Sequence, residues 1–258
     1  MRSPRAFRST RESPRLACVD AGAGRVEWWT ETAAEEPPVY GERWAYVGGR
    51  AYRAFEPARS KLAAALAKGW AGPRPREGER WLYLGAASGT TASHVADLVG
   101  PSGRLFAVER SLRPFGRLLA LAERWPSLEP ILADARDTRA YAGLVPPVDG
   151  IYADIAQADQ VEIVRANAAL FLRGAGGALL IALKTASMGR DASAPEHVRR
   201  AERELERDVD LAPSVRLDPF HKGHYFVGGT VAPSLFRDPS PAAAVTPRSG
   251  RPPGRSRP

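Results

Sequence analysis

Four charged side chains, those of Glu109, Asp134, Asp154 and Lys184, each follow a short apolar run in the sequence. Carboxylates accept hydrogen bonds from sugar hydroxyls, and an amine or a carboxylate can move a proton. If the apolar runs are parallel strands of one sheet, their ends meet at one edge and the four side chains share one crevice. We therefore expect a binding site at that edge, in which Asp154 pairs with Lys184 and orients it.

A turn of small residues, 85–89, follows the apolar run 81–84 and precedes a helix-like stretch. Gly85 and Gly89 let the backbone turn tightly and come close to a ligand. Thr90 can cap the following helix and offers a hydroxyl at its N-terminus. Glu109 comes about twenty residues later, where a carboxylate commonly binds a pair of ribose hydroxyls. The spacing predicts a nucleotide-like cofactor, although such turns also serve packing alone.

Strand-like and helix-like stretches alternate through the middle of the chain. We expect strands at 80–84, 104–108, 130–133, 150–153 and 178–183, and helices between them at 91–99, 114–124, 138–144 and 160–171. This alternation predicts a parallel sheet with helices on both faces. A charged helix at 195–208 and strands at 214–217 and 225–231 follow. The closing β-hairpin is typical of the class I methyltransferase fold, an α/β fold whose seven-stranded, Rossmann-like sheet ends in an antiparallel strand.

Composition divides the chain into four segments. Residues 1–16 are rich in Arg, Ser and Pro, which predicts a disordered basic arm. Residues 17–55 form a small β module with a hairpin turn at Gly48-Gly49. We expect residues 56–236, which open with a helix at 60–68, to form the domain with the methyltransferase fold. We expect residues 237–258, which are rich in Pro and Arg, to form a disordered tail.

The positive charge is concentrated at the two ends of the chain. The 258 residues carry a formal charge of +8, and residues 1–16 and 237–258 contribute +4 each. Basic ends of this kind either hold a polyanion through its phosphates or only keep the chain soluble. The single cysteine, Cys18, excludes an internal disulfide and indicates a reducing compartment. No apolar run is long enough to predict a membrane span.

Several distinctive short motifs occur one after another along residues 39–230. They are 39–43 (VYGER), 57–65 (PARSKLAAA), 82–91 (LYLGAASGTT), 93–95 (SHV), 134–136 (DAR), 154–157 (DIAQ), Asn167, 217–220 (LDPF), His224 and Gly228-Gly229. The long glycine-containing turn and the RSKLA stretch are the most specific of them. With these motifs the chain resembles the fibrillarin family of box C/D methyltransferases, in its archaeal form.

The resemblance implies S-adenosylmethionine as cofactor and the ribose 2′-hydroxyls of RNA as substrate. By position, Thr90 and Thr91 line the methionine end of the cofactor and Glu109 holds its ribose. Arg110 stands where the family usually has an aromatic or apolar residue that packs on the cofactor. The other cofactor contacts implied are Asp134 and Ala135 beside the adenine, the turn residues Gly85, Ala86 and Ser88, and the closing segment Asp154, Ile155, Ala156 and Gln157.

The family's proposed catalytic group corresponds to Lys61, Asp154, Lys184 and His224. A 2′-hydroxyl is a weak nucleophile, so alignment of the reactants should supply much of the rate. We expect an unprotonated Lys184 to accept the hydroxyl proton and Asp154 to orient it. Lys61 would position the hydroxyl or a phosphate, and His224 would brace the site. A sulfonium methyl is already activated, so we expect no metal, and His94 is interpreted as a packing residue.

The family obtains its sequence specificity from other molecules. The resemblance implies a Nop5-like scaffold protein, L7Ae, a box C/D guide RNA and substrate rRNA or tRNA as partners, with no membrane. One alternative is a methyltransferase of the same fold that acts alone, on RNA or on protein glutamine. Another is an assembly protein that keeps the fold and only binds partners. We see no Gly/Arg-rich amino-terminal domain, which disfavours a nucleolar form and favours the cytoplasm of an archaeal cell.

Overall fold

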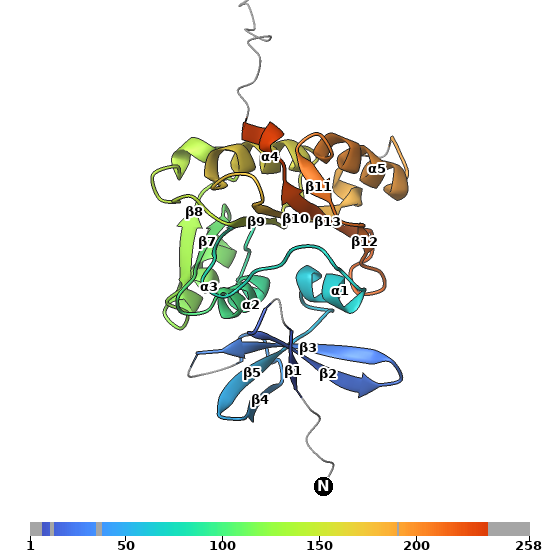
Figure 1. The fold of residues 1–258 in the computed structure, drawn as a ribbon. Coiled ribbons are helices and arrows are strands. Elements are labelled where there is room, and N and C mark those ends of the chain that lie inside the picture. Colours follow the sequence, from blue (N-terminus) through green and yellow to red (C-terminus); the bar gives the residue numbers. More distant parts are fainter. Residues whose placement is uncertain (1–6, 11–12, 35–37, 190, 237–258) are drawn as a thin grey trace, which may run out of the picture.

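The protein contains two β-sheets, a small antiparallel one and a large mixed one (Figure 1). The computed structural model describes residues 7–10, 13–34, 38–189 and 191–236. Figure 1 shows the small amino-terminal sheet below helices α1 and α2, with the large sheet on the other side of these helices. Across the described part of the chain, no helix has the length and apolarity needed to cross a bilayer.

The small sheet has the strand order β1-β2-β3-β5-β4. Its last two strands form the predicted hairpin, because Gly48 and Gly49 both have positive φ, 58° and 77°, as a two-residue type I′ turn requires. The strands are β1 (Arg8–Ser9), β2 (Leu16–Gly22), β3 (Arg25–Thr32), β4 (Trp44–Val47) and β5 (Arg50–Phe55).

The small sheet begins earlier than predicted, within residues 1–16, which we expected to be disordered. Phe7 packs its ring 5.2 Å from that of Trp29. The Arg15 side chain is 9% exposed, and it pairs with Glu31 at 3.2 Å. The Arg-rich composition predicted disorder wrongly, because a guanidinium can be buried when carboxylates and carbonyls accept its hydrogen bonds. We had also predicted disorder for residues 1–6, 11–12 and 237–258, which are outside the described part of the chain.

The large sheet has the order β11-β13-β10-β9-β6-β7-β8, and β12 pairs with β13 off this path. The five central strands agree with the prediction to within two residues at each end. As predicted, β13 runs antiparallel to β10. The strands are β6 (Arg80–Leu84), β7 (Arg104–Glu109), β8 (Leu128–Leu132), β9 (Gly150–Ala153), β10 (Ala178–Lys184), β11 (Val209–Leu211), β12 (Val215–Arg216) and β13 (His224–Val231).

The predicted closing hairpin is present, and the large sheet has one edge strand that was not predicted. The expected strand at 214–217 is the two-residue β12, which pairs with β13. The edge of the main path is β11, which lies just after the predicted helix and was not assigned to any element. Strand β11 has only three residues, Val209, Asp210 and Leu211, so its apolar–polar–apolar pattern is too short to predict a strand. Its backbone becomes a strand because Asp210 pairs with Thr230 of β13.

Helices cover both faces of the large sheet. Helices α1 (Lys61–Ala67), α2 (Thr90–Val99) and α3 (Leu112–Ala122) share one core with Trp81 and Tyr83. Helices α4 (Gln160–Phe171) and α5 (Ala194–Leu205) share the other core with Leu82 and Leu84. Successive strand residues point to opposite faces, which explains the division. The helix expected at 138–144 is only a short 3₁₀ turn, Thr138–Ala140.

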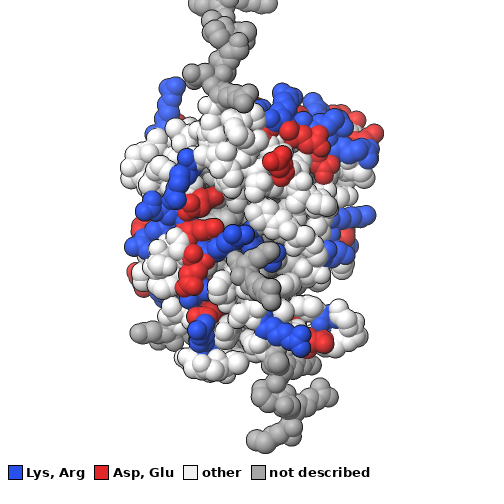
Figure 2. Space-filling view, viewed as in Figure 1, with Lys and Arg blue, Asp and Glu red and all other residues white. Residues whose placement is uncertain are grey.

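Helix α5 carries many charged side chains on its exposed surface (Figure 2).

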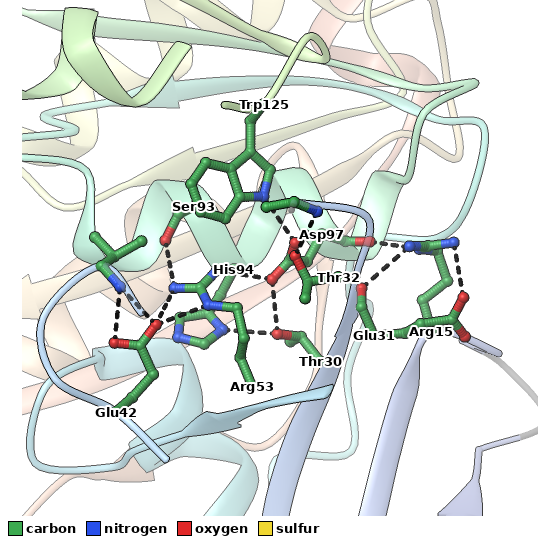
Figure 3. Close-up of polar contacts among 12 residues, drawn as sticks. Arg15, Thr30, Glu31, Thr32, Glu42, Arg53, Ser93, His94, Asp97 and Trp125 are labelled. Carbon is green, nitrogen blue, oxygen red and sulfur yellow. Dashed lines mark hydrogen bonds and ion pairs between the residues drawn. The ribbon is translucent and has the colours of Figure 1, made fainter. Parts of the chain in front are cut away.

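A buried ionic network joins the small sheet to α2 (Figure 3). Arg53 of β5 lies 2.6 Å from a Glu42 oxygen and 2.8 Å from an Asp97 oxygen, and all three side chains are fully buried. The same guanidinium donates to Ser93 Oγ at 3.1 Å, and Trp125 donates to Asp97 at 2.7 Å. The network therefore holds the small sheet to the helix that starts at the predicted cofactor turn.

His94 of α2 belongs to the same layer and has the packing role expected from the sequence. Its ring nitrogens lie 2.8 Å from Thr30 Oγ1 and 2.9 Å from Tyr40 Oη, and its ring stacks on Phe55. Burial and the nearby Arg53 guanidinium lower the pKa of His94 well below its usual value. The imidazole is therefore neutral near pH 7.

We predict that Arg53→Met lowers the free energy of unfolding by about 3–5 kcal/mol, because it leaves the Glu42 and Asp97 carboxylates buried without their cation. Urea unfolding followed by circular dichroism measures the effect. Arg50→Met is the matched control, because it removes an exposed guanidinium that pairs with Glu31. An equal shift of the urea midpoint in both variants would contradict the role given to Arg53.

Candidate active site

The turn after β6 lies at one edge of the large sheet, where it leads into α2 and approaches the backbone of Asp154. Gly85 has φ +81°, and a Cβ there would lie 2.6 Å from the carbonyl oxygen of Asp154. Gly89, with φ +90°, is the N-cap of α2 and provides no side-chain bond. The expected cap, Thr90, is instead the first residue of the helix. Both glycines are therefore required by their positive φ and by close neighbours.

Glu109 at the end of β7 holds this turn in place. Its carboxylate accepts a hydrogen bond from Ala87 N at 2.9 Å and from Ser111 N at 2.7 Å. These bonds join the turn after β6 to the loop after β7. A carboxylate has about four acceptor positions, so two remain for a ligand. Ala87 has φ +49°, and its bond to Glu109 contributes to stabilising that uncommon conformation.

A cavity of about 230 Å³ opens beside Glu109 at the carboxyl ends of the strands. Most of the predicted cofactor contacts line it, so the structure brings together the ends of β6, β7, β8 and β9. Those predicted lining residues are Gly85, Glu109, Arg110, Asp134, Ala135, Asp154, Ile155, Ala156 and Gln157.

Four other predicted contacts do not line this cavity. Ala86 is buried, and Ser88 and Thr90 are partly buried. Thr91 is also buried, and its hydroxyl donates to Ser60 Oγ at 3.0 Å. The structure thus gives Thr91 a contact with α1 that the sequence did not predict.

Sequence reasoning missed several apolar or small residues that line the cavity. They are Ala87, Val108, Ala133 and Ile163. Val108 and Ala133 are the residues immediately before the charged strand ends, and we had assigned both to strand cores. Because they directly precede Glu109 and Asp134 in the sequence, they could have been predicted to line the cavity.

Asp134 at the cavity rim is shared by two arginines. Arg136 Nη2 lies 2.7 Å and Arg110 Nη1 3.5 Å from Asp134 Oδ2. Hydrogen bonds from the Arg136 side chain and backbone lower the pKa of Asp134 to about 2. The carboxylate is therefore ionised at any physiological pH, and Arg110 occupies the rim as a cation.

Asp154 pairs with Lys61 and not with Lys184, which corrects the predicted ion pair. Lys61 Nζ lies 2.7 Å from Asp154 Oδ2, and both side chains are about one-fifth exposed. Lys61 is the first residue of α1, and Ser60 is its N-cap. Because Thr91 of α2 donates to Ser60, the start of α1 lies next to the start of α2. The pair joins two elements far apart in sequence, so strand order alone could not predict it.

Lys184 and His224 face each other across β10 and β13, where they are register partners. Within the described part of the chain, Lys184 forms no ion pair. Burial lowers the pKa of His224, and the charges of Lys61 and Lys184 act in the same direction. Lys184 and His224 are thus adjacent on neighbouring strands, and Lys61 begins α1, which packs against β13. The four predicted catalytic residues are therefore gathered at one end of the sheet.

His221 ties the loop before β13 to the start of α1. Its Nε2 lies 2.9 Å from the carbonyl oxygen of Pro57, and its ring centre lies 6.0 Å from that of His224. Burial, assisted by the charge of Lys61, lowers the pKa of His221. The bond to Pro57 gives His221 a packing role.

Comparisons with known proteins place the chain in context. A family model described as fibrillarin matches residues 12–233. The chain is 44% identical over 210 residues to a fibrillarin-like rRNA/tRNA 2′-O-methyltransferase of Staphylothermus marinus, with 81% of this chain and 89% of the relative covered.

Two solved structures extend the comparison. Aeropyrum pernix fibrillarin with natively bound S-adenosylmethionine matches with a TM-score of 0.78 at 38% identity, over 88% of this chain and 98% of the other. A fibrillarin/Nop5p complex matches with a TM-score of 0.70 at 40% identity, over 78% and 92%.

We predict that Arg136→Ala raises the pKa of Asp134 from about 2 toward about 3.9, the value of an unperturbed carboxyl. Arg110→Ala should raise it less, because Arg110 is the more distant partner. Carboxyl-carbon NMR titration measures both. Since the folded pKa is depressed, Asp134 stabilises the fold above about pH 4 and loses this effect as the pH falls toward 2. An unchanged titration in Arg136→Ala would contradict the pairing.

Proposed function

The chain belongs to the fibrillarin family, and from that premise we propose that it is an S-adenosylmethionine-dependent RNA ribose 2′-O-methyltransferase. We further propose that it is the catalytic subunit of a box C/D guide ribonucleoprotein that modifies rRNA and tRNA. The observation that carries the proposal is the placement of the Lys61–Asp154 pair, Lys184 and His224 beside a cavity lined by Glu109.

The cavity fits the proposed cofactor. Glu109 keeps two acceptor positions beside its bonds to Ala87 and Ser111, which suits the two hydroxyls of a ribose. The close approach of Gly85 to the Asp154 backbone leaves no room for a side chain at that position of the wall. When bound, S-adenosylmethionine supplies a methyl group activated by its sulfonium. Asp134, Ala135 and the segment 155–157 would enclose the rest of the nucleoside.

The lysines have different surroundings, which suits different roles. Lys61 is held by Asp154 at 2.7 Å, so it is a fixed cation able to donate to the substrate's sugar or phosphate oxygens. Lys184 lacks an ion-pair partner within the described part of the chain. In its unprotonated form, its amine would accept the proton of the attacking 2′-hydroxyl as the oxygen–carbon bond forms and the methyl carbon separates from the sulfonium sulfur, which leaves as a neutral thioether. His224, whose imidazole has a lowered pKa, would brace the site beside Lys184. This assignment revises the expected role of Asp154, which orients Lys61.

The proposed partners follow from the same relatives. A fibrillarin/Nop5p complex has been solved, so we infer a Nop5-like scaffold as partner of this chain. L7Ae, the guide RNA and the substrate RNA complete the proposed particle. A formally neutral central region, residues 17–236, suits a catalyst delivered to RNA by other subunits.

Label transfer from methyl-labelled S-adenosylmethionine to a target RNA tests the whole proposal. We expect transfer to one ribose only when scaffold, L7Ae and the matching guide are all present. Transfer without guide, or to protein glutamine, would favour a stand-alone enzyme. Failure to bind S-adenosylmethionine in calorimetry would favour an assembly protein without catalysis.

We predict that Lys184→Ala slows single-turnover methylation by about 10²–10⁴-fold, the usual contribution of a proton acceptor. Its affinity for S-adenosylmethionine should stay within about twofold of wild type, because Lys184 does not line the cofactor cavity. Lys68→Ala, at the exposed end of α1, is the matched control. Normal turnover by Lys184→Ala in the reconstituted particle would remove this residue from the mechanism.

A further inference from the structure

Strands β10 and β13 end side by side at two of the residues proposed for catalysis. Lys184 is the last residue of β10, His224 is the first of β13, and the two are register partners. Terminal pairs of a strand ladder open locally unless the residues beyond them are also held. Beyond this pair lie Thr185 on one side and the β12–β13 loop, residues 217–223, on the other. How that loop is held therefore decides how precisely Lys184 and His224 face each other.

Thr185 attaches the β12–β13 loop to the end of β10. Its backbone N–H and its hydroxyl both donate to the carbonyl oxygen of Gly223, at 3.1 and 2.9 Å. Thr185 is 4% exposed, so water has little access to compete for these bonds. Gly223 has φ +68°, a conformation that residues with a side chain disfavour. The two bonds fix the direction of this carbonyl group and continue the contact between the two chain segments past the last strand pair.

His221 attaches the other side of the same loop to the residues before α1. Its Nε2–H donates to the carbonyl oxygen of Pro57 at 2.9 Å, and the chain continues from Pro57 to Lys61 at the start of α1. The carbonyl group of His221 accepts a hydrogen bond from the His224 N–H at 3.2 Å. The His224 ring is also bonded to the loop, because its Nδ1 lies 3.0 Å from the carbonyl oxygen of Lys222. A displacement of the loop would therefore move the His224 ring.

The β12–β13 loop thus connects the two proposed catalytic lysines. Thr185 directly follows Lys184, and the His221 bond holds the segment that leads to Lys61. The Lys61 ammonium group is itself held by Asp154 at 2.7 Å. Methyl transfer requires the attacking oxygen to be aligned with the methyl carbon, and a displacement of about 1 Å can slow such a step about 100-fold. The rate therefore depends on how rigidly the loop fixes the two lysines.

We propose that Thr185 and His221 are positioning residues of the methyltransferase: by holding both sides of the β12–β13 loop, they set the separation of Lys61 and Lys184 around the target ribose. The inference rests on the proposed function for the identity of the reaction. Neither Thr185 nor His221 lines the cofactor cavity, so neither should change the affinity for S-adenosylmethionine. Both act through the lysines and His224, without contact with the reacting atoms.

A purely structural role predicts a different result. A hydroxyl–carbonyl bond that only stabilises the fold would lower the urea midpoint when it is removed, and would leave the rate of the folded enzyme unchanged. A positioning role predicts that the rate falls, that binding is retained, and that the effect requires Lys184. Kinetics on the folded variants therefore separates the two roles.

Single-turnover methylation in the reconstituted particle tests the proposal. Thr185→Val removes the hydroxyl and keeps the shape of the side chain, and it should slow methyl transfer about 10–100-fold with unchanged affinity for S-adenosylmethionine and RNA. Thr185→Ser keeps a hydroxyl and should recover most of the rate. Ser13→Ala is the matched control, because it removes another buried hydroxyl that donates to a carbonyl, that of Pro75 at 3.2 Å. The control should react like wild type.

A second variant keeps the test decisive if Thr185→Val does not fold. His221→Phe keeps a ring and removes the N–H that binds Pro57, and it should slow methyl transfer to a similar extent. His221→Gln restores an N–H donor and should recover part of the rate. Amide hydrogen exchange gives a readout independent of activity: the His224 N–H should exchange faster in Thr185→Val and His221→Phe, while β6 stays protected as in wild type.

A double-mutant cycle with Lys184→Ala completes the test. Thr185→Val should cause little further loss of rate in that background, because the residue through which it acts is already absent. A wild-type rate in both Thr185→Val and His221→Phe would overturn the proposal, and so would a full, additive loss in the Lys184→Ala background. A wild-type particle that transfers no methyl group would instead refute the proposed function, a result that is distinct from any effect of the loop variants.

Discussion

A parallel sheet places the carboxyl ends of its strands along one edge, and the site depends on that constraint. Strands β6, β7, β8 and β9 differ in length and sequence, yet each contributes the residues that follow it to one cavity. Glu109 makes this arrangement rigid by binding the backbone of two separate loops. Its carboxylate therefore has a structural role in addition to the proposed ligand contact.

The small amino-terminal sheet helps to position the helix that begins at the cofactor turn. Through Arg53 it holds Ser93 and Asp97 of α2, the helix that begins at the cofactor turn. Guanidinium and carboxylate groups are costly to bury, and they are tolerated here because every partner is present. The small sheet and the turn are thereby joined through one helix, so the position of the turn depends on a part of the chain without direct contact to the cavity.

The two edges of the large sheet carry different kinds of side chains. Lys61, Lys184 and His224, which are proposed for catalysis, lie where α1 meets β13. Strand β8 forms the opposite edge of the large sheet from β11, and Leu132 there and Leu112 and Leu119 of α3 are exposed. Arg110 lies between the two, on the cavity rim.

The sequence by itself determined the central strands, the helices beside them and most of the cavity lining. Apolar runs and small-residue turns are local properties, and the parallel topology follows from their alternation. Only the tertiary structure decided that Asp154 pairs with Lys61, that Arg15 is buried and that β11 forms the edge strand. Each of these depends on a partner distant in sequence, so the free energy that selects it is absent from any local pattern.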